Sequence, residues 1–113
     1  IARLEQIFQL LNEEPDAKKC EGMEGLIKEA ESVIEDTEAG SATRDVALIV
    51  SAQKAEHYEI AAYGSLRQLA KTINKAEVSR LLEQTLQEEK ETDMLLSNLA
   101  ETLINQDARL EAR

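Results

Sequence analysis

The stretch between residues 43 and 73 carries the longest helical pattern in the chain, and the rest of the fold must be built around it. Its apolar side chains recur in alternating steps of three and four residues, which places them on one stripe of a helix: Leu48, Ala52, Ala55, Ala62, Leu66, Leu69 and Ile73. Glu59 falls in the middle of this stripe, and Glu56 borders it one turn earlier. An isolated ionised carboxylate is costly in an apolar interior, so Glu59 has to be paired, protonated or bound to a cation. The two glutamates are therefore the first candidates for a functional site.

Composition and charge limit the class of protein. The 113 residues include four Gly, one Pro and only 3% aromatic residues, which is typical of a single all-α domain. A net charge of −10 disfavours nucleic acid and anionic membrane surfaces as partners and favours cations. The single Cys excludes an intrachain disulfide and fits a reducing compartment. The longest apolar run, residues 46–50, is too short to span a bilayer, and no signal peptide is visible, so we expect a cytoplasmic protein.

Two shorter helices are predicted before the long one. Residues 1–11 have an apolar face with no capping residue in front, so we expect the end of a helix that begins upstream and closes before Glu14-Pro15. Residues 20–37 are predicted to form an amphipathic helix, with Cys20 packed at its start. The side chains expected to face the core are Met23, Leu26, Ile27, Ala30, Val33 and Ile34. A loop follows, and Ser41 or Thr43 is the expected cap of the long helix.

The last helix is predicted over residues 75–107. Asn74 is its expected N-cap, and Glu77, three residues on, completes a capping box. Its apolar face consists of Val78, Leu81, Leu82, Thr85, Leu86, Thr92, Leu96, Leu99 and Leu103. Two acidic residues interrupt that face, Glu89 at its centre and Asp93 one turn later.

The two long helices must run antiparallel and side by side, because their connection at Asn74 is so short. Glu59 and Glu89 are equally far from Asn74 and therefore lie at the same height, with Glu56 and Asp93 about one turn further out. Carboxylates brought this close repel one another unless a positive charge lies between them. Carboxylate oxygens suit iron and manganese, and helical bundles build dinuclear sites from such residues. These four residues are our candidate metal ligands.

The same residues also allow an interpretation without metal. Glu56 and Glu59 can pair with Lys or Arg of other helices, Glu89 can be protonated, and helical spacing alone does not choose between the two interpretations. His57 points roughly 160° away from Glu59 around the helix, which favours an interface or capping role over metal ligation. Tyr63 lies beside the cluster, where it can form a hydrogen bond to it.

Three segments carry a resemblance to a known family: residues 52–64 (AQKAEHYEIAAYG), 19–27 (KCEGMEGLI) and 88–93 (EEKETD). They resemble the bacterial YciF-like (YciE/YciF, DUF892) stress proteins, and the resemblance covers the whole chain. It implies a ferritin-like fold related to rubrerythrin, an antiparallel four-helix bundle with an extra short helix in the crossover. It also implies a dinuclear iron or manganese centre and a homodimer. Residues 1–113 would then be the C-terminal portion of the domain: the tail of the second helix, the short crossover helix, and the third and fourth helices.

The resemblance also implies two further helices upstream, with one more Glu and a Glu-x-x-His. Ferritin relatives place His after the last-helix Glu, whereas this chain has Thr92 and Asp93, which weakens the case for ferroxidase activity. The resemblance assigns no catalytic reaction. We expect a di-metal carboxylate protein of the bacterial stress response, with no other cofactor; the alternative is a metal-free helical dimerisation or scaffold protein. We place the homodimer contact on a second stripe of the long helix: Val46, Val50, Ala61 and Gly64.

Overall fold

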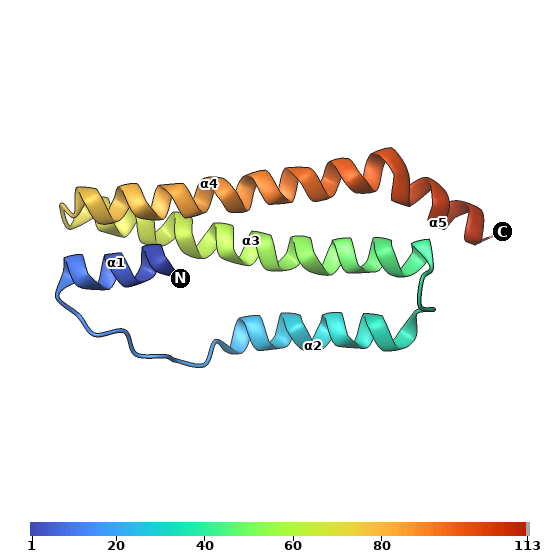
Figure 1. The fold of residues 1–113 in the computed structure, drawn as a ribbon, viewed down its shortest axis with the longest axis horizontal. Helices are drawn as coiled ribbons and strands as arrows, with labels where there is room; N and C mark the ends of the chain where they lie inside the picture. The colour runs from blue at the N-terminus through green and yellow to red at the C-terminus, as the bar shows by residue number, and fades with distance from the viewer. Residues whose placement is uncertain (113) are drawn as a thin grey trace.

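The computed structural model describes residues 1–112 and is built from helices and their connections. In chain order these are α1 (Ala2–Leu11), α2 (Glu21–Asp36), α3 (Ala42–Thr72), α4 (Ala76–Leu99), the π-helical turn η1 (Ala100–Ile104) and α5 (Asn105–Glu111). The chain forms an elongated body of 57 × 27 × 20 Å. In Figure 1, α3 and α4 lie side by side as a long hairpin, α2 runs along α3, and α1 lies at the closed end of the hairpin. The prediction of an all-α fold is confirmed.

No described helix combines the length and the apolar character needed to cross a membrane.

The turn between α3 and α4 depends on a left-handed residue. Asn74 has φ +58°, its N–H donates to the Lys71 carbonyl at 3.0 Å, and the N–H of Lys75 donates to the Ala70 carbonyl at 2.8 Å. This is the Schellman arrangement that ends a helix, and Asn tolerates it better than most residues. Asn74 therefore ends α3, and the predicted capping box is wrong, because an N-cap needs extended backbone. Lys75 stands at the N-cap of α4 without a side-chain hydrogen bond, and Glu77 pairs with Arg80.

The best-packed part of the core lies at the closed end of the hairpin. Ile7 of α1 packs there against Ala70 of α3 and against Val78, Leu81 and Leu82 of α4. Each large aliphatic side chain buried in this way contributes about 1.5–3 kcal/mol. This apolar cluster therefore holds α1 and the two long helices together at the closed end of the hairpin.

The stripe of α3 that meets α4 lies next to the one predicted as the core. Ile49 and Ala70 are buried, and Gln53 and Arg67 contact α4 through Asp93 and Glu83. The predicted stripe instead lines two grooves. At one end of the stripe, Leu48, Ala52 and Ala55 line a groove together with residues of α2. At the other end, Leu66, Leu69 and Ile73 line a groove together with residues of α1.

The predicted core stripe is consequently open over much of its length. Leu69 is 59% exposed and Ile73 is 60% exposed. The prediction failed because periodicity identifies an apolar face but not the helix that covers it.

Helix α2 lies on α3 through small and half-buried side chains. A Cβ on Gly22 would lie 2.7 Å from the Tyr58 ring, so the glycine permits the close approach. The Cys20 sulfur caps α2 by accepting from the Met23 N–H at 3.4 Å, and it lies 3.1 Å from the Tyr58 hydroxyl. Cys20 is at the start of the helix as predicted, but it is exposed rather than packed, and Ile27 and Ile34, predicted to be buried, are exposed as well.

The last helix continues to Glu111, further than predicted, and it contains a π-helical turn at Ala100–Ile104. A π-turn holds one extra residue, so every later side chain is rotated by about 100° relative to an α-helix. Leu103, predicted to face the core, is 59% exposed, while Ile104 and Ala108 are half-buried in its place.

The side chain of Glu111 consequently reaches the start of α3. Its carboxylate accepts the N–H groups of Ala42 at 2.7 Å and Thr43 at 2.9 Å, and these bonds lower the pKa of Glu111. Ser41 caps α3, as predicted, by accepting from the Arg44 N–H at 3.1 Å. Arg44 in turn donates to the Thr37 side chain at 3.0 Å and to carbonyls at the end of α2. The open end of the hairpin is therefore held by charged groups at helix termini.

We predict that Glu111→Gln lowers the melting temperature at neutral pH by a small amount. Because the folded-state pKa of Glu111 lies below its ordinary value of 4.5, its carboxylate stabilises the fold above that value, and the effect is lost as pH falls through the folded pKa. Melting curves of wild type and variant should therefore converge in acid. Glu101→Gln, which removes the same charge from an exposed position in η1, is the control; an equal loss in both variants would contradict the capping role.

Candidate metal centre

Three glutamates meet where α3 and α4 lie side by side. Glu56 and Glu59 come from α3 and Glu89 from α4, all three are half-buried, and one carboxylate oxygen of each lies within 4.8 Å of the others. Glu59 and Glu89 approach each other as expected from their equal distance from Asn74, because the short turn leaves the two helices in register. The structure thus brings together three of the four candidate ligands, and their role as metal ligands stays a prediction.

The charge of this three-glutamate cluster is not neutralised by the described part of the chain. Glu56 Oε2 is buried and has no hydrogen-bond partner among residues 1–112. None of the ion pairs in this range includes a cluster residue. The neighbouring arginines are paired elsewhere, Arg3 with Glu88 and Arg67 with Glu83. Pairing of Glu56 and Glu59 with Lys or Arg, one part of the metal-free interpretation, is not seen within the described residues; the other part, protonation of Glu89, agrees with the raised pKa of Glu89.

Crowding of the carboxyl groups changes their proton affinities. Burial raises the pKa of Glu59, and the nearby charge of Glu89 adds to the effect. The nearby carboxyl group of Glu56 raises the pKa of Glu89, and burial adds to the effect. The pKa of Tyr63 is raised by burial and by the charges of Glu59 and Glu89, in agreement with the predicted position of Tyr63 beside the cluster.

Asp93, the fourth candidate ligand, is directed to other partners. Its Oδ1 accepts from Gln53 Nε2 at 3.3 Å, and its Oδ2 lies 3.1 Å from Nε2 of His57, whose side chain is 67% exposed. Gln53 also donates to Ser97 Oγ at 2.7 Å. Ligation by Asp93 remains a prediction, but in this structure its carboxylate is held outside the cluster. His57 lies outside it as well, in agreement with its predicted direction.

The Gln53 network was missed by the sequence analysis. Its signal was available in principle: Gln53 precedes Glu56 by one turn, and Asp93 and Ser97 follow Glu89 in successive steps of four residues on α4. The error followed from assigning the α4-facing side of α3 to the neighbouring stripe.

The donor set fits a metal ion. Two oxygen ligands on opposite sides of an ion, each at about 2.1 Å, are about 4.2 Å apart, so small side-chain shifts would close a 4.8 Å cluster around a cation. A buried oxygen without a partner is the kind of atom that a cation satisfies. The cluster is therefore the candidate metal centre of this chain.

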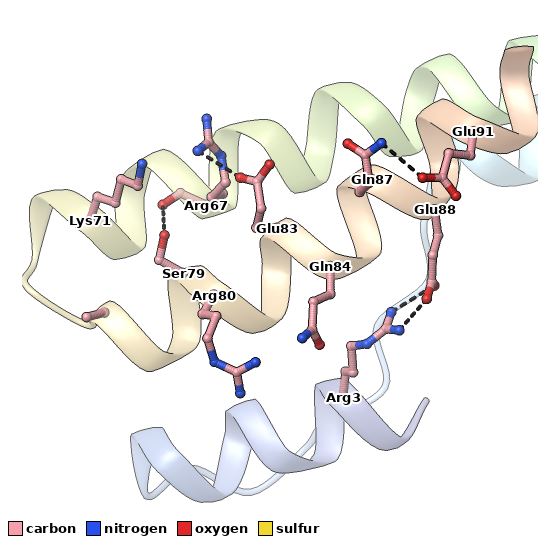
Figure 2. A pocket seen from close by; sticks show the side chains of 11 residues that line it. Arg3, Arg67, Lys71, Ser79, Arg80, Glu83, Gln84, Gln87, Glu88 and Glu91 are labelled. Atoms are coloured by element: carbon pink, nitrogen blue, oxygen red, sulfur yellow. Dashed lines mark hydrogen bonds and ion pairs between the residues drawn. The ribbon is translucent and has the colours of Figure 1, made fainter.

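A second hollow, shown in Figure 2, is lined by arginines and glutamates of α1, α3 and α4. Each of its three arginines forms an ion pair: Arg3 pairs with Glu88, Arg67 with Glu83 and Arg80 with Glu77. Arg3 also donates to Thr85 Oγ1 at 3.0 Å and so ties α1 to α4. The ion pairs around this hollow support the hairpin. The candidate metal centre is therefore the three-glutamate cluster and not this hollow.

We predict that the metal-free protein becomes less stable as pH rises from the ordinary carboxyl range toward neutrality. Glu59 and Glu89 have raised folded-state pKa values, so the folded state holds protons that the unfolded state releases, and this stabilisation is lost as pH passes through the raised values. Melting temperatures of chelator-treated protein test this. The double variant Glu59→Gln/Glu89→Gln should flatten the profile, whereas Glu31→Gln on exposed α2 should not; a flat wild-type profile would contradict the charge crowding.

Comparisons with known proteins identify the family of this chain. A family model described as "Domain of unknown function (DUF892)" matches residues 1–109. Protein YciF of Escherichia coli (strain K12) is 46% identical over 114 residues, which cover 97% of this chain and 68% of YciF. The crystal structure of the E. coli stress protein YciF matches with a TM-score of 0.86 and 47% identity over 93% of this chain and 66% of that chain.

A second solved structure, YcfI of Rhodopseudomonas palustris, for which a structural role has been suggested, matches with a TM-score of 0.79 and 38% identity over 86% of this chain and 61% of that chain. The chain thus spans about two thirds of the length of these relatives. The helical-bundle fold expected from the resemblance is confirmed by the match to YciF. The chain belongs to the DUF892 family, which includes the stress protein YciF.

Proposed function

We propose that this chain supplies the carboxylate ligands of a dinuclear iron or manganese centre in a ferritin-like protein of the bacterial stress response, acting in the cytoplasm. The observation that carries the proposal is that Glu56 Oε2 is buried without a partner among residues 1–112, in a side chain that lies close to two further carboxylates. Membership of the YciF family supports the stress-response part. The single Cys and its reducing-compartment chemistry support the location.

Each residue has a definite task in this proposal. Glu56, Glu59 and Glu89 hold the metal, which when bound supplies positive charge and, for iron or manganese, a redox couple. The Tyr63 phenol lies near Glu59 and Glu89, where it can donate a hydrogen bond to a carboxylate. Asp93 joins the ligands only if it leaves Gln53 and His57.

Glu59→Ala tests the proposal. We expect metal affinity to fall by more than about tenfold, because even partners outside the ligand shell typically change affinity by that factor. The measurement is the iron and manganese content of protein purified without chelator, with Glu31→Ala as a control that removes a carboxylate from an exposed position. Equal metal content in wild type and Glu59→Ala would contradict the proposal.

A metal-free assembly module is the second candidate, because much apolar surface is left open. The exposed large apolar side chains on α3, α4 and the helix beyond include Leu66, Leu69, Ile73, Met94, Leu95, Leu99 and Leu103. On the second stripe of α3, Val50 and Ala61 are exposed, and α2 lies along a different stripe. The structural role suggested for YcfI supports this candidate for its relatives. Such surfaces typically mark contacts with other helices.

We predict that the protein is a homodimer and that Ala61→Glu shifts it toward monomer. A large charged side chain among Val50, Ala61 and Gly64 prevents a second helix from approaching, while α3 itself tolerates Glu well. Light scattering at micromolar concentration measures the mass, and circular dichroism checks that helix content is unchanged. Ala17→Glu, in the exposed connector before α2, is the matched control. A monomeric wild type would show that the stripe has no such role.

A further inference from the structure

A second pair of metal-ligating side chains lies beside the three-glutamate cluster, at the exposed edge between α3 and α4. The imidazole Nε2 of His57 lies 3.1 Å from Oδ2 of Asp93, and the His57 side chain is 67% exposed. Neither residue belongs to the three-glutamate cluster in this structure. Imidazole nitrogen and carboxylate oxygen are both common ligands of divalent transition metals. The pair therefore has the chemistry of a separate cation site that solvent reaches.

The Asp93 carboxylate is fixed by a network that leaves one of its oxygens turned to His57. Gln53 Nε2 donates to Asp93 Oδ1 at 3.3 Å and to Ser97 Oγ at 2.7 Å. The Asp93 side chain is 21% exposed, so the network holds it between the two helices. A ligating carboxylate that is itself hydrogen-bonded is the usual arrangement around a protein-bound metal. An exposed ion pair contributes little to stability and needs no such support.

The distance between the two ligand atoms decides which ion geometry fits. Metal–nitrogen and metal–oxygen bonds are about 2.1 Å long, so two ligands 3.1 Å apart subtend roughly 95° at a shared ion. Neighbouring ligands of a tetragonal ion are about 90° apart, whereas those of a tetrahedral ion lie about 3.4 Å from each other. Tetragonal coordination by nitrogen and oxygen is typical of Cu²⁺ and Ni²⁺.

The surrounding charge favours a cation at this position. Glu89 lies one turn before Asp93 on α4, and no ion pair among residues 1–112 includes Glu56, Glu59 or Glu89. Within the same range Asp93 pairs with His57 and with no Lys or Arg. A neighbouring group of carboxylates without basic partners raises the local concentration of cations.

We propose that His57 and Asp93 form a second, exposed cation site, separate from the three-glutamate cluster, that takes a tetragonal divalent ion, Cu²⁺ or Ni²⁺. Nε2 of His57 and Oδ2 of Asp93 ligate the ion, which replaces the direct contact between the two side chains. Gln53 is a positioning residue that acts through Asp93. The inference does not require metal in the cluster, but Asp93 is not available to the cluster while it holds this ion.

Nickel titration of the Cys20→Ser protein tests the site, because this substitution removes an exposed thiol that also binds nickel. We expect the Ni²⁺ affinity, measured by isothermal titration calorimetry, to fall by more than about tenfold in His57→Ala and in Asp93→Asn, since each variant loses a ligand. Gln53→Ala should weaken binding by about tenfold, as loss of a supporting hydrogen bond typically does. Glu101→Gln, which removes an exposed carboxylate of η1, is the control and should leave the affinity unchanged.

The imidazole signals of the protein locate the ion. His57 is the single histidine of the chain, so its ring gives one set of NMR signals, and bound paramagnetic Cu²⁺ broadens them. We expect the same broadening at the same Cu²⁺ concentration when Glu59→Gln is added to remove a ligand of the cluster. Broadening that disappears with Glu59→Gln would place the ion in the cluster and overturn the inference. Nickel affinity that is unchanged in His57→Ala would overturn it as well.

Two further outcomes are distinguishable from these. A mass that doubles on addition of Ni²⁺, measured by light scattering, would show that the ion bridges two copies and would overturn a site within one chain. The three-glutamate centre is tested separately, by iron and manganese content in Glu59→Ala. Loss of nickel binding in the wild-type protein therefore contradicts the exposed site alone, and equal iron and manganese content in Glu59→Ala contradicts the three-glutamate centre alone.

Discussion

The left-handed turn at Asn74 is the constraint on which the site depends. The hydrogen bonds of Asn74 and Lys75 to the end of α3 reverse the chain within three residues and leave α3 and α4 antiparallel in one register. In that register Glu59 faces Glu89, and Gln53 reaches Asp93 and Ser97. A longer or differently shaped turn would shift one helix along the other and separate these pairs.

The hairpin places a well-packed core and a crowded carboxylate cluster at different heights. Ile7, Ala70 and the α4 residues around Leu82 form an apolar contact at the closed end. Glu56, Glu59 and Glu89 lie further along, where like charges oppose the approach of the two helices. The packing, together with ion pairs such as Arg3–Glu88, offsets that repulsion. A fold that retains such a cluster at this cost is consistent with a functional use of the carboxylates.

Much of the fold and part of the site could be predicted from local pattern. The helices could be predicted from the placement of Gly and Pro and from the three-and-four spacing of apolar residues. The antiparallel hairpin could be predicted from the short connection at Asn74. The equal distance of Glu59 and Glu89 from Asn74 was sufficient to predict that these two residues lie together, because the rise per residue of a helix is constant. The direction of His57 also followed, since it is set by the rotation per residue within one helix.

The sequence by itself determined what depends on one helix or one turn: helix positions, amphipathic faces, the Ser41 cap and the height of each carboxylate. Only the tertiary structure decided which stripe of α3 meets α4, and hence that Gln53 and His57 hold Asp93 outside the cluster. It also decided the π-turn at Ala100–Ile104, which rotates Leu103 outward and sends Glu111 to the start of α3. Periodicity describes a helix about its own axis, whereas these features depend on how neighbouring helices are rotated against one another, and that is set by the packing of all of them together.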